Sequence, residues 1–226
     1  GEAGDLAGWS VSLSNDGNVV AIGSPYNDGN GTSSGCLRIY QNVNNTWTQV
    51  GSDINGEASG DQSGRSVSLS SDGSVVAIGA EGNDGNGGQG SGHVRIYKNI
   101  NNTWTQVGSD IDGEASSDSS GRSVSLSADG SIIAIGATGN GGNGNSSGHV
   151  RIYKNVNNTW TQLGGDIDGE AAGDWSGFSV SLSDDGSIVA IGAWQNDSNG
   201  TDSGHVRIYK NVNNNWTQVG GDIDGE

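Results

Sequence analysis

The sequence predicts an all-β fold built from four copies of one small sheet, and three observations predict it. Five equivalent glutamates stand 55, 57, 56 and 56 residues apart, which indicates internal repeats: Glu2, Glu57, Glu114, Glu170 and Glu226. Short segments within each repeat alternate apolar and polar residues, as β-strands do. Glycine is abundant, with 42 of the 226 residues, and no segment shows helical periodicity.

Each repeat divides into four expected strands, described here for the second copy. Residues 65–70 alternate serine with apolar residues, which indicates a strand with one apolar face. Residues 75–80 are almost entirely apolar, as in a strand buried on both faces. Residues 93–98 alternate again, and residues 103–107 form the fourth strand. We expect these segments, and their equivalents in every copy, to form one antiparallel sheet.

The turns follow known sequence preferences. An Asp-Gly pair stands between the first two strands of every repeat, and this pair accepts the positive φ angles of a tight hairpin. The four pairs are Asp16-Gly17, Asp72-Gly73, Asp129-Gly130 and Asp185-Gly186. A variable loop rich in asparagine and glycine follows the second strand, and a short asparagine turn joins the last two.

A repeat of about 56 residues is too small to bury a core of its own, so neighbouring repeats must cover one another. Four antiparallel strands per repeat are typical of a β-propeller blade. A β-solenoid is the alternative, but its coils are usually shorter and its strands parallel. We predict one propeller domain over residues 1–226, with repeats at 1–55, 56–112, 113–168 and 169–226. The largest apolar side chain of each repeat, expected in the core, is one tryptophan: Trp47, Trp104, Trp160 and Trp216.

Two motifs recur in all four repeats. A Gly-x-Ser-Val segment opens the first strand, as in Gly8-Trp9-Ser10-Val11, and a Gly-Ala or Gly-Ser pair ends the second, as in Gly79-Ala80. Together with the tyrosine strand and the Trp-Thr-Gln strand, they resemble the FG-GAP repeat family, which includes the integrin α-subunit propeller and several lectins. The resemblance covers the whole chain and implies an extracellular β-propeller.

The sequence departs from this family in two ways. The calcium loop that many members carry is shortened here to Ser-x-Asp-Gly, so we expect no calcium at Asp72 or Asp129. Family propellers commonly have seven blades, whereas four are present. A closed four-bladed ring, which we favour, and a segment of a longer array both stay open. The absence of methionine indicates a piece cut from a longer product.

The composition excludes two classes of partner. The net charge of −17 repels polyanions. The nine lysines and arginines occupy three equivalent repeat positions instead of one basic patch, so we expect no nucleic-acid binding. No run of about 18 apolar residues is present, so we expect no membrane insertion. Cys36 is the single cysteine, which excludes a disulfide within the chain.

Catalysis finds no support in the sequence. His93, His149 and His205 occupy one repeat position, and Cys36 replaces them in the first copy. We expect these histidines on an exposed strand face. A nucleophile, a base and an acid must converge on one site, whereas duplication spreads identical residues apart. We therefore predict neither an enzyme nor a zinc site.

Two other groups are candidate binding sites. Acidic residues at the repeat boundaries have two interpretations: they converge on a calcium ion, which takes six to eight oxygen ligands, or they are simply solvated. We expect that the protein requires no cofactor. The candidates are Asp110, Asp112, Glu114, Asp166, Asp168 and Glu170.

Four aromatic residues stand outside the repeated pattern, in the first and last copies only: Trp9, Tyr26, Trp175 and Trp194. In a closed ring they either bind a sugar or protein or seal the contact between those copies.

These features predict a non-catalytic recognition or adhesion module that binds a glycan or an extracellular protein. The module is expected to be secreted or at the cell surface. The alternative is a structural subunit of a surface layer, matrix or filament, which implies self-association. Near-identical repeats suit that alternative as well.

Overall fold

The computed structural model describes residues 3–226, which form strands and turns but no helix. No helix in this part of the chain could therefore cross a membrane. Blade 1 comprises β1 (Ser10–Leu13), β2 (Val19–Ser24), β3 (Cys36–Val43), β4 (Thr46–Gln49) and β5 (Ile54–Asn55). Blade 2 comprises β6 (Ser66–Leu69), β7 (Val75–Ala80), β8 (His93–Ile100), β9 (Thr103–Gln106) and β10 (Ile111–Asp112).

The last two blades repeat this arrangement. Blade 3 comprises β11 (Ser120–Leu126), β12 (Ile132–Ala137), β13 (His149–Val156), β14 (Thr159–Gln162) and β15 (Ile167–Asp168). Blade 4 comprises β16 (Ser179–Leu182), β17 (Ile188–Ala193), β18 (His205–Val212), β19 (Asn215–Gln218) and β20 (Ile223–Asp224).

Strand order follows chain order within each blade, and all pairings are antiparallel. In blade 3, β11, β12, β13 and β14 lie side by side, and the short β15 pairs with the start of β13. The predicted all-β propeller fold and its four-stranded antiparallel sheets are confirmed. Sequence analysis missed the fifth strand, because two residues carry no periodic pattern.

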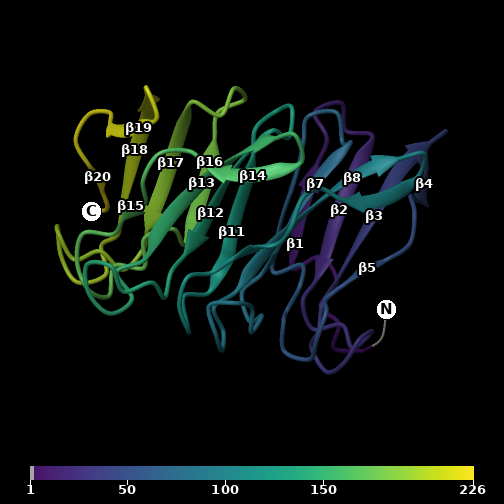
Figure 1. Cartoon of the computed structure of the whole chain (residues 1–226), viewed down its shortest axis with the longest axis horizontal. Coiled ribbons are helices and arrows are strands. Elements are labelled where there is room, and N and C mark those ends of the chain that lie inside the picture. The colour runs from purple at the N-terminus through teal and green to yellow at the C-terminus, as the bar shows by residue number, and fades with distance from the viewer. Residues whose placement is uncertain (1–2) are drawn as a thin grey trace.

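The four blades stand side by side in chain order, and their first strands form the inner contacts. β1 contacts β6, β6 contacts β11, and β11 contacts β16. Figure 1 shows blade 1, in purple, and blade 4, in yellow, at opposite ends of the row. The prediction of a closed four-bladed ring is therefore wrong. The packing of neighbouring faces sets the angle between blades, and three such contacts do not bring blade 4 round to blade 1.

The core lies between the blades, where one set of positions packs three times. Between blades 1 and 2, Leu37 and Ile39 of β3 pack against Leu69, Val76 and Ile78 of β6 and β7. Equivalent clusters lie at the next two contacts. The repeated tryptophan of the following blade joins each cluster: Trp104, Trp160 and Trp216. A repeat thus buries its apolar surface against its neighbour.

Hydrogen bonds also cross each contact. Nε1 of Trp104 donates to the carbonyl oxygen of Val50 in blade 1 at 2.9 Å, and the equivalent bonds at the next two contacts measure 2.8 and 2.7 Å. Oγ of Ser10 in β1 donates to the carbonyl oxygen of Gly64 at 2.8 Å. The serines that alternate with apolar residues in the first strand therefore join one blade to the next.

Candidate functional site

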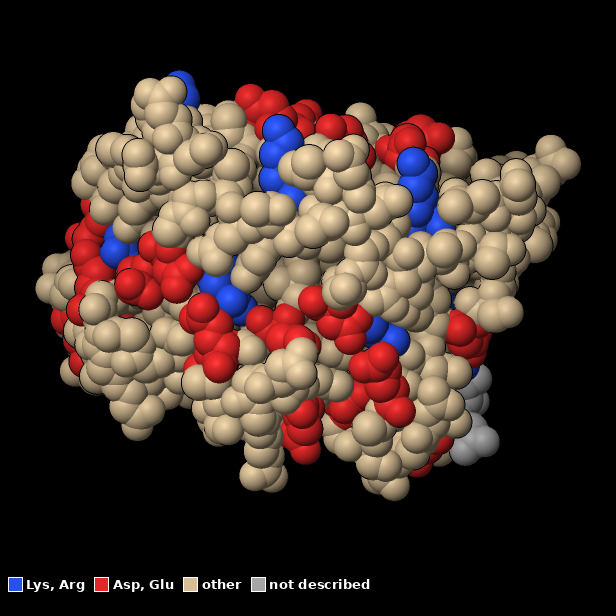
Figure 2. Space-filling model, viewed as in Figure 1, with Lys and Arg blue, Asp and Glu red and all other residues tan. Residues whose placement is uncertain are grey.

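Two sets of polar and aromatic side chains lie at one end of the blades, which we call the loop end. There the second strand of each blade stops, and a long loop such as residues 81–92 leads to the third strand. Ala80, the last residue of β7, pairs with His93, the first of β8. Residues that flank these strands therefore come together. Acidic side chains gather over the lower half of the face shown in Figure 2, with basic ones beside them.

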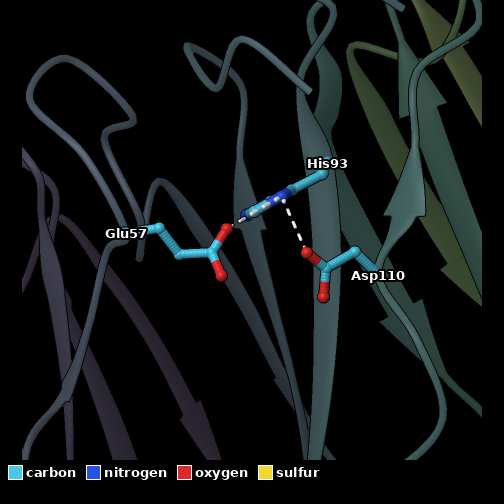
Figure 3. A group of neighbouring side chains, drawn as sticks. All are labelled: Glu57, His93 and Asp110. Atoms are coloured by element: carbon cyan, nitrogen blue, oxygen red, sulfur yellow. Dashed lines mark ion pairs between the residues drawn. The ribbon is translucent and has the colours of Figure 1, made fainter. Parts of the chain in front are cut away.

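The imidazole of His93 lies between the carboxylates of Glu57 and Asp110 (Figure 3). Its Nδ1 is 3.9 Å from Oε2 of Glu57 and 3.6 Å from Oδ2 of Asp110. Blades 3 and 4 repeat this arrangement. We call the three sets the Glu–His–Asp groups: Glu57, His93 and Asp110; Glu114, His149 and Asp166; Glu170, His205 and Asp222.

The histidines of these groups are buried, so the prediction of an exposed strand face is wrong. His93, His149 and His205 are 1%, 1% and 5% exposed. For His93, one cause is visible in the backbone, where a bridge between Gly92 and Ser120 brings blade 3 against the start of β8. Burial lowers the pKa of His93 and of His149, and the arginine two residues further on in each strand lowers it further. Both effects favour the neutral imidazole.

The acidic residues of one repeat boundary divide between two blades. Asp110 faces His93 of its own blade, whereas Glu114 faces the group of His149 in the next blade. The same division separates Asp166 from Glu170. Asp112 and Asp168 lie outside the three groups. Four of the six acidic candidates thus lie in these groups, and the histidine that each group shares was not among the candidates.

A cavity of about 740 Å³ opens beside the first Glu–His–Asp group. Glu57, His93 and Asp110 line it together with Asp112. The carboxylate of Asp112 is engaged elsewhere, because it accepts a hydrogen bond from Nδ2 of Asn86 at 2.5 Å. The surface of the cavity is therefore acidic, because the carboxylates of Glu57 and Asp110 are accessible while the His93 imidazole is almost fully buried.

A continuous strip of aromatic and charged side chains crosses the loop end from blade 1 to blade 4. At its first end the rings of Trp9 and Tyr26 meet edge to face, with centroids 5.9 Å apart. The guanidinium of Arg65 in blade 2 lies 4.3 Å from the centroid of the Trp9 ring. Nε of Arg65 is also 2.8 Å from Oε1 of Glu81, so an ion pair connects the Trp9 end of the strip to Glu81.

The strip continues beyond Glu81 to the last blade. Nη1 of Arg122 is 3.1 Å from Oε2 of Glu81, and its guanidinium lies 4.6 Å from the centroid of the Phe178 ring. The Phe178 and Trp194 rings are 5.5 Å apart, and Trp194 meets Trp175 edge-on at 6.2 Å. We call these eight side chains the aromatic strip: Tyr26, Trp9, Arg65, Glu81, Arg122, Phe178, Trp194 and Trp175.

The four aromatic residues predicted as a ligand site all lie on this strip, in two separate pairs. Trp9 and Tyr26 occupy its blade 1 end, and Trp175 and Trp194 its blade 4 end. The expected contact between the pairs across a ring seam does not form, because blades 1 and 4 do not meet. Sequence analysis missed the charged middle of the strip. The sequence did contain a signal for this part of the strip, because four of its residues occupy the same variable position of the repeat: Trp9, Arg65, Arg122 and Phe178.

Known proteins share both the repeat and the fold. The FG-GAP repeat model matches residues 1–40 and 167–209, in the first and last parts of the chain. These two segments therefore carry FG-GAP repeats. No curated protein sequence matches this chain.

Solved structures with the same fold are larger proteins. The periplasmic gluconolactonase of Pseudomonas aeruginosa gives a TM-score of 0.63 at 14% identity, over 95% of this chain and 56% of its own. Kuenenia stuttgartiensis hydrazine synthase gives 0.61 at 11% identity, over 97% and 50%. A 6-phosphogluconolactonase candidate from Bacteroides uniformis gives 0.53 at 12% identity, over 96% and 71%. The chain spans about half the length of the first two, and at these identities the likeness shows the fold alone.

These structures correct the prediction that the chain is not an enzyme. Two of them are described as lactonases, so a propeller of this shape is compatible with hydrolysis and gives no ground to exclude it. The prediction assumed that repetition keeps catalytic groups apart. Each Glu–His–Asp group instead brings an imidazole and two carboxylates together, and such sets can move protons.

Proposed function

We propose that this FG-GAP propeller is a secreted or cell-surface recognition module that binds a glycan along the aromatic strip. The continuity of the strip supports this most, because it crosses four blades and joins flat rings through charged groups. Sugar rings offer apolar C–H faces that stack on aromatic rings. Their hydroxyl groups pair with guanidinium and carboxylate groups. An extended glycan matches both features.

The strip is accessible and already positioned. The Trp9 and Trp194 side chains are 46% and 47% exposed, so each offers ring surface to a ligand. Arg65 and Glu81 are held by their ion pair and are mostly buried. Side chains that are fixed before binding lose little conformational entropy when a ligand arrives.

A glycan suits the strip better than a protein partner does. Protein interfaces centre on an apolar patch that is depleted of charged residues. The centre of the strip is instead the chain of ion pairs from Arg65 through Glu81 to Arg122. A protein partner is the other outcome that the binding test can reveal.

Affinity electrophoresis against a panel of neutral and acidic polysaccharides, followed by calorimetry with the strongest binder, tests the proposal. Trp9→Ala and Trp194→Ala should each weaken binding at least about tenfold, because each removes a stacking surface. Trp47→Ala is the matched control, since Trp47 is 48% exposed but lies off the strip. Failure to bind any polysaccharide, or an equal loss in the Trp47 variant, contradicts the proposal.

Hydrolysis of a sugar lactone is a second candidate function, and the cavity beside the first Glu–His–Asp group favours it. A carboxylate of Glu57 or Asp110 takes a proton from a water molecule that attacks the lactone carbonyl. The ring C–O bond then breaks, and the ring oxygen receives the proton. Acid release from glucono-δ-lactone, followed with a pH indicator, should exceed the spontaneous rate. The double substitution Glu57→Gln with Asp110→Asn should abolish the excess and Trp9→Ala should not. A wild-type rate equal to the spontaneous one removes this candidate.

A further inference from the structure

We propose that each Glu–His–Asp group binds one divalent transition-metal ion of the Zn²⁺ type, so that the chain holds three. This inference goes beyond glycan recognition, because no side chain of the aromatic strip belongs to a Glu–His–Asp group. It rests on the free donor atoms, their spacing, and the side chains that orient them.

Each buried histidine has one ring nitrogen without a hydrogen-bond partner, which is Nε2 in His93 and His149 and Nδ1 in His205. In blade 4, Nδ1 of His205 is buried and has no hydrogen-bond partner. It lies 3.7 Å from Oε2 of Glu170 and 4.0 Å from Oδ2 of Asp222, which is too far for a hydrogen bond. A buried polar atom without a partner costs free energy. An ion placed between the three side chains would satisfy it.

The spacing of the donors suits a small ion. Zinc bonds to nitrogen and oxygen are about 2.0–2.2 Å long, so two donors on one ion stand roughly 3–4.4 Å apart. The imidazole–carboxylate distances in the first group, 3.6 and 3.9 Å, fall in this range. In every group, one donor atom from each residue lies within 4.8 Å of the other two. The half-exposed Glu57 can adjust the remaining distance.

Each carboxylate is held by one oxygen and turns the other toward the imidazole. Oδ1 of Asp110 accepts a hydrogen bond from Nε2 of Gln106 at 2.6 Å, while Oδ2 faces His93. Oε1 of Glu57 is 3.7 Å from Nη1 of Arg95, while Oε2 faces His93. The same glutamine and arginine partners recur in blades 3 and 4. Outer partners of this kind orient the ligands of metal sites.

The donor set favours a zinc-type ion over the calcium that acidic residues alone suggest. Calcium is bound by oxygen ligands, whereas imidazole together with carboxylates suits zinc and its neighbours. Two carboxylates also balance the charge of a divalent ion. All three groups offer this mixed set.

Blade 1 provides an internal contrast. Cys36 stands in the place of the histidine, and Nε of Arg38 pairs with Oδ2 of Asp53 at 2.8 Å. The carboxylate oxygen that faces the imidazole in the other blades is therefore occupied by a cation of the chain itself. Glu2, the equivalent glutamate, lies outside the described residues. We assign no ion to this blade.

The experiment uses the whole chain, with any affinity tag removed and prior treatment with a chelator. Equilibrium dialysis against Zn²⁺ with elemental analysis should give three ions per chain, and Co²⁺ should give saturable visible absorption bands. Asp110→Asn should reduce three ions to two. Asp112→Asn is the matched control and should keep three, because Asp112 lines the same cavity but lies outside the group.

Several results would overturn the proposal. The proposal is overturned if the wild-type chain shows no saturable binding of Zn²⁺ or Co²⁺. It is also overturned if the Asp112→Asn variant loses an ion, or if the Asp110→Asn variant keeps all three. If Asp110→Asn fails to fold by circular dichroism, His149→Gln in blade 3 takes its place, with the same expected loss of one ion. Glycan binding by the metal-free chain separates this outcome from that of the proposed function.

Discussion

Blades 1 and 2 carry the same repeat but differ in what covers them. Trp104 packs against blade 1 and donates to the Val50 carbonyl, whereas its equivalent Trp47 is exposed. Leu69 is 8% exposed, and its equivalent Leu13 is 57% exposed. Identical residue types thus stand in a core in one blade and on the surface in the other. The comparison teaches that the stability of the row resides in the contacts between blades.

The outer face of blade 4 shows the other half of the same contact. Ile111 of blade 2 is buried against blade 3, while its equivalent Ile223 is exposed. The two outer faces therefore display the two sides of a contact that forms three times within the row. Self-association through such faces, which the structural-subunit alternative requires, stays a prediction.

The largest difference is expected between two glycines at the ends of second strands. A Cβ atom on Gly136 overlaps the carbonyl oxygen of Gly177, which belongs to the backbone of the next blade. A Cβ atom on Gly192 in blade 4 meets only the side chain of Ser179, which can rotate. Gly136→Ala should cost about 3 kcal/mol or prevent folding, and Gly192→Ala less than about 1 kcal/mol. Chemical denaturation measures both, and similar costs would break the comparison.

A leucine pair sharpens the same point. Leu69→Ala leaves a cavity in the cluster between blades 1 and 2 and should lower the unfolding free energy by about 3 kcal/mol. Leu13→Ala removes a side chain that water already reaches, so its effect should stay below about 1 kcal/mol. Guanidinium melts of the two variants give the values. A Leu13 variant as unstable as the Leu69 variant contradicts the account.

The fold could be predicted from the sequence wherever the signal is local. Alternation within residues 65–70 and the Asp72-Gly73 turn depend on neighbours in the chain, and β6 and its hairpin follow them. The closed ring could not be judged in this way. The angle between blades arises from side-chain packing across each contact, which no single repeat encodes.

The candidate site was predictable only in part. Trp9 and Trp194 stood out because they break the repeat, and both lie on the aromatic strip. The repeat positions of the lysines and arginines argue only against nucleic-acid binding, so Arg65 does not stand out in the sequence, although its ion pair with Glu81 joins the two ends of the strip. His93 was assigned to a solvent-facing position, because alternation gives the face of a strand and says nothing of what covers that face.

The smallest effect is expected at the Asp72 side chain, whose hydrogen bonds all come from its own hairpin. Burial alone would raise the pKa of Asp72, but hydrogen bonds from the Ser74 amide and the Ser70 hydroxyl outweigh it and lower the pKa below 3.8. Asp72→Ala should cost about 1 kcal/mol at neutral pH, and Asp129→Ala about the same. Denaturation at a series of pH values measures both costs.

The pH dependence of this effect has a definite sign. Because the pKa is lower in the folded chain, the unfolded chain binds the proton first as the pH falls. The stabilisation is therefore complete above pH 3.8 and is lost as the pH falls below it. A cost that grows on acidification, or that differs widely between the two variants, would show that the turn depends on its surroundings.

The paired substitution of two equivalent tryptophans tests most directly whether contacts between blades hold the molecule together. Trp104→Ala removes packing against blade 1 and the hydrogen bond to Val50, and should lower the unfolding free energy by about 2–4 kcal/mol. Trp47→Ala removes the same side chain from an uncovered face, and should lower it by less than about 1 kcal/mol. Denaturant melts of both variants under one set of conditions provide the comparison. Equal losses, or a larger loss for Trp47→Ala, would contradict the account.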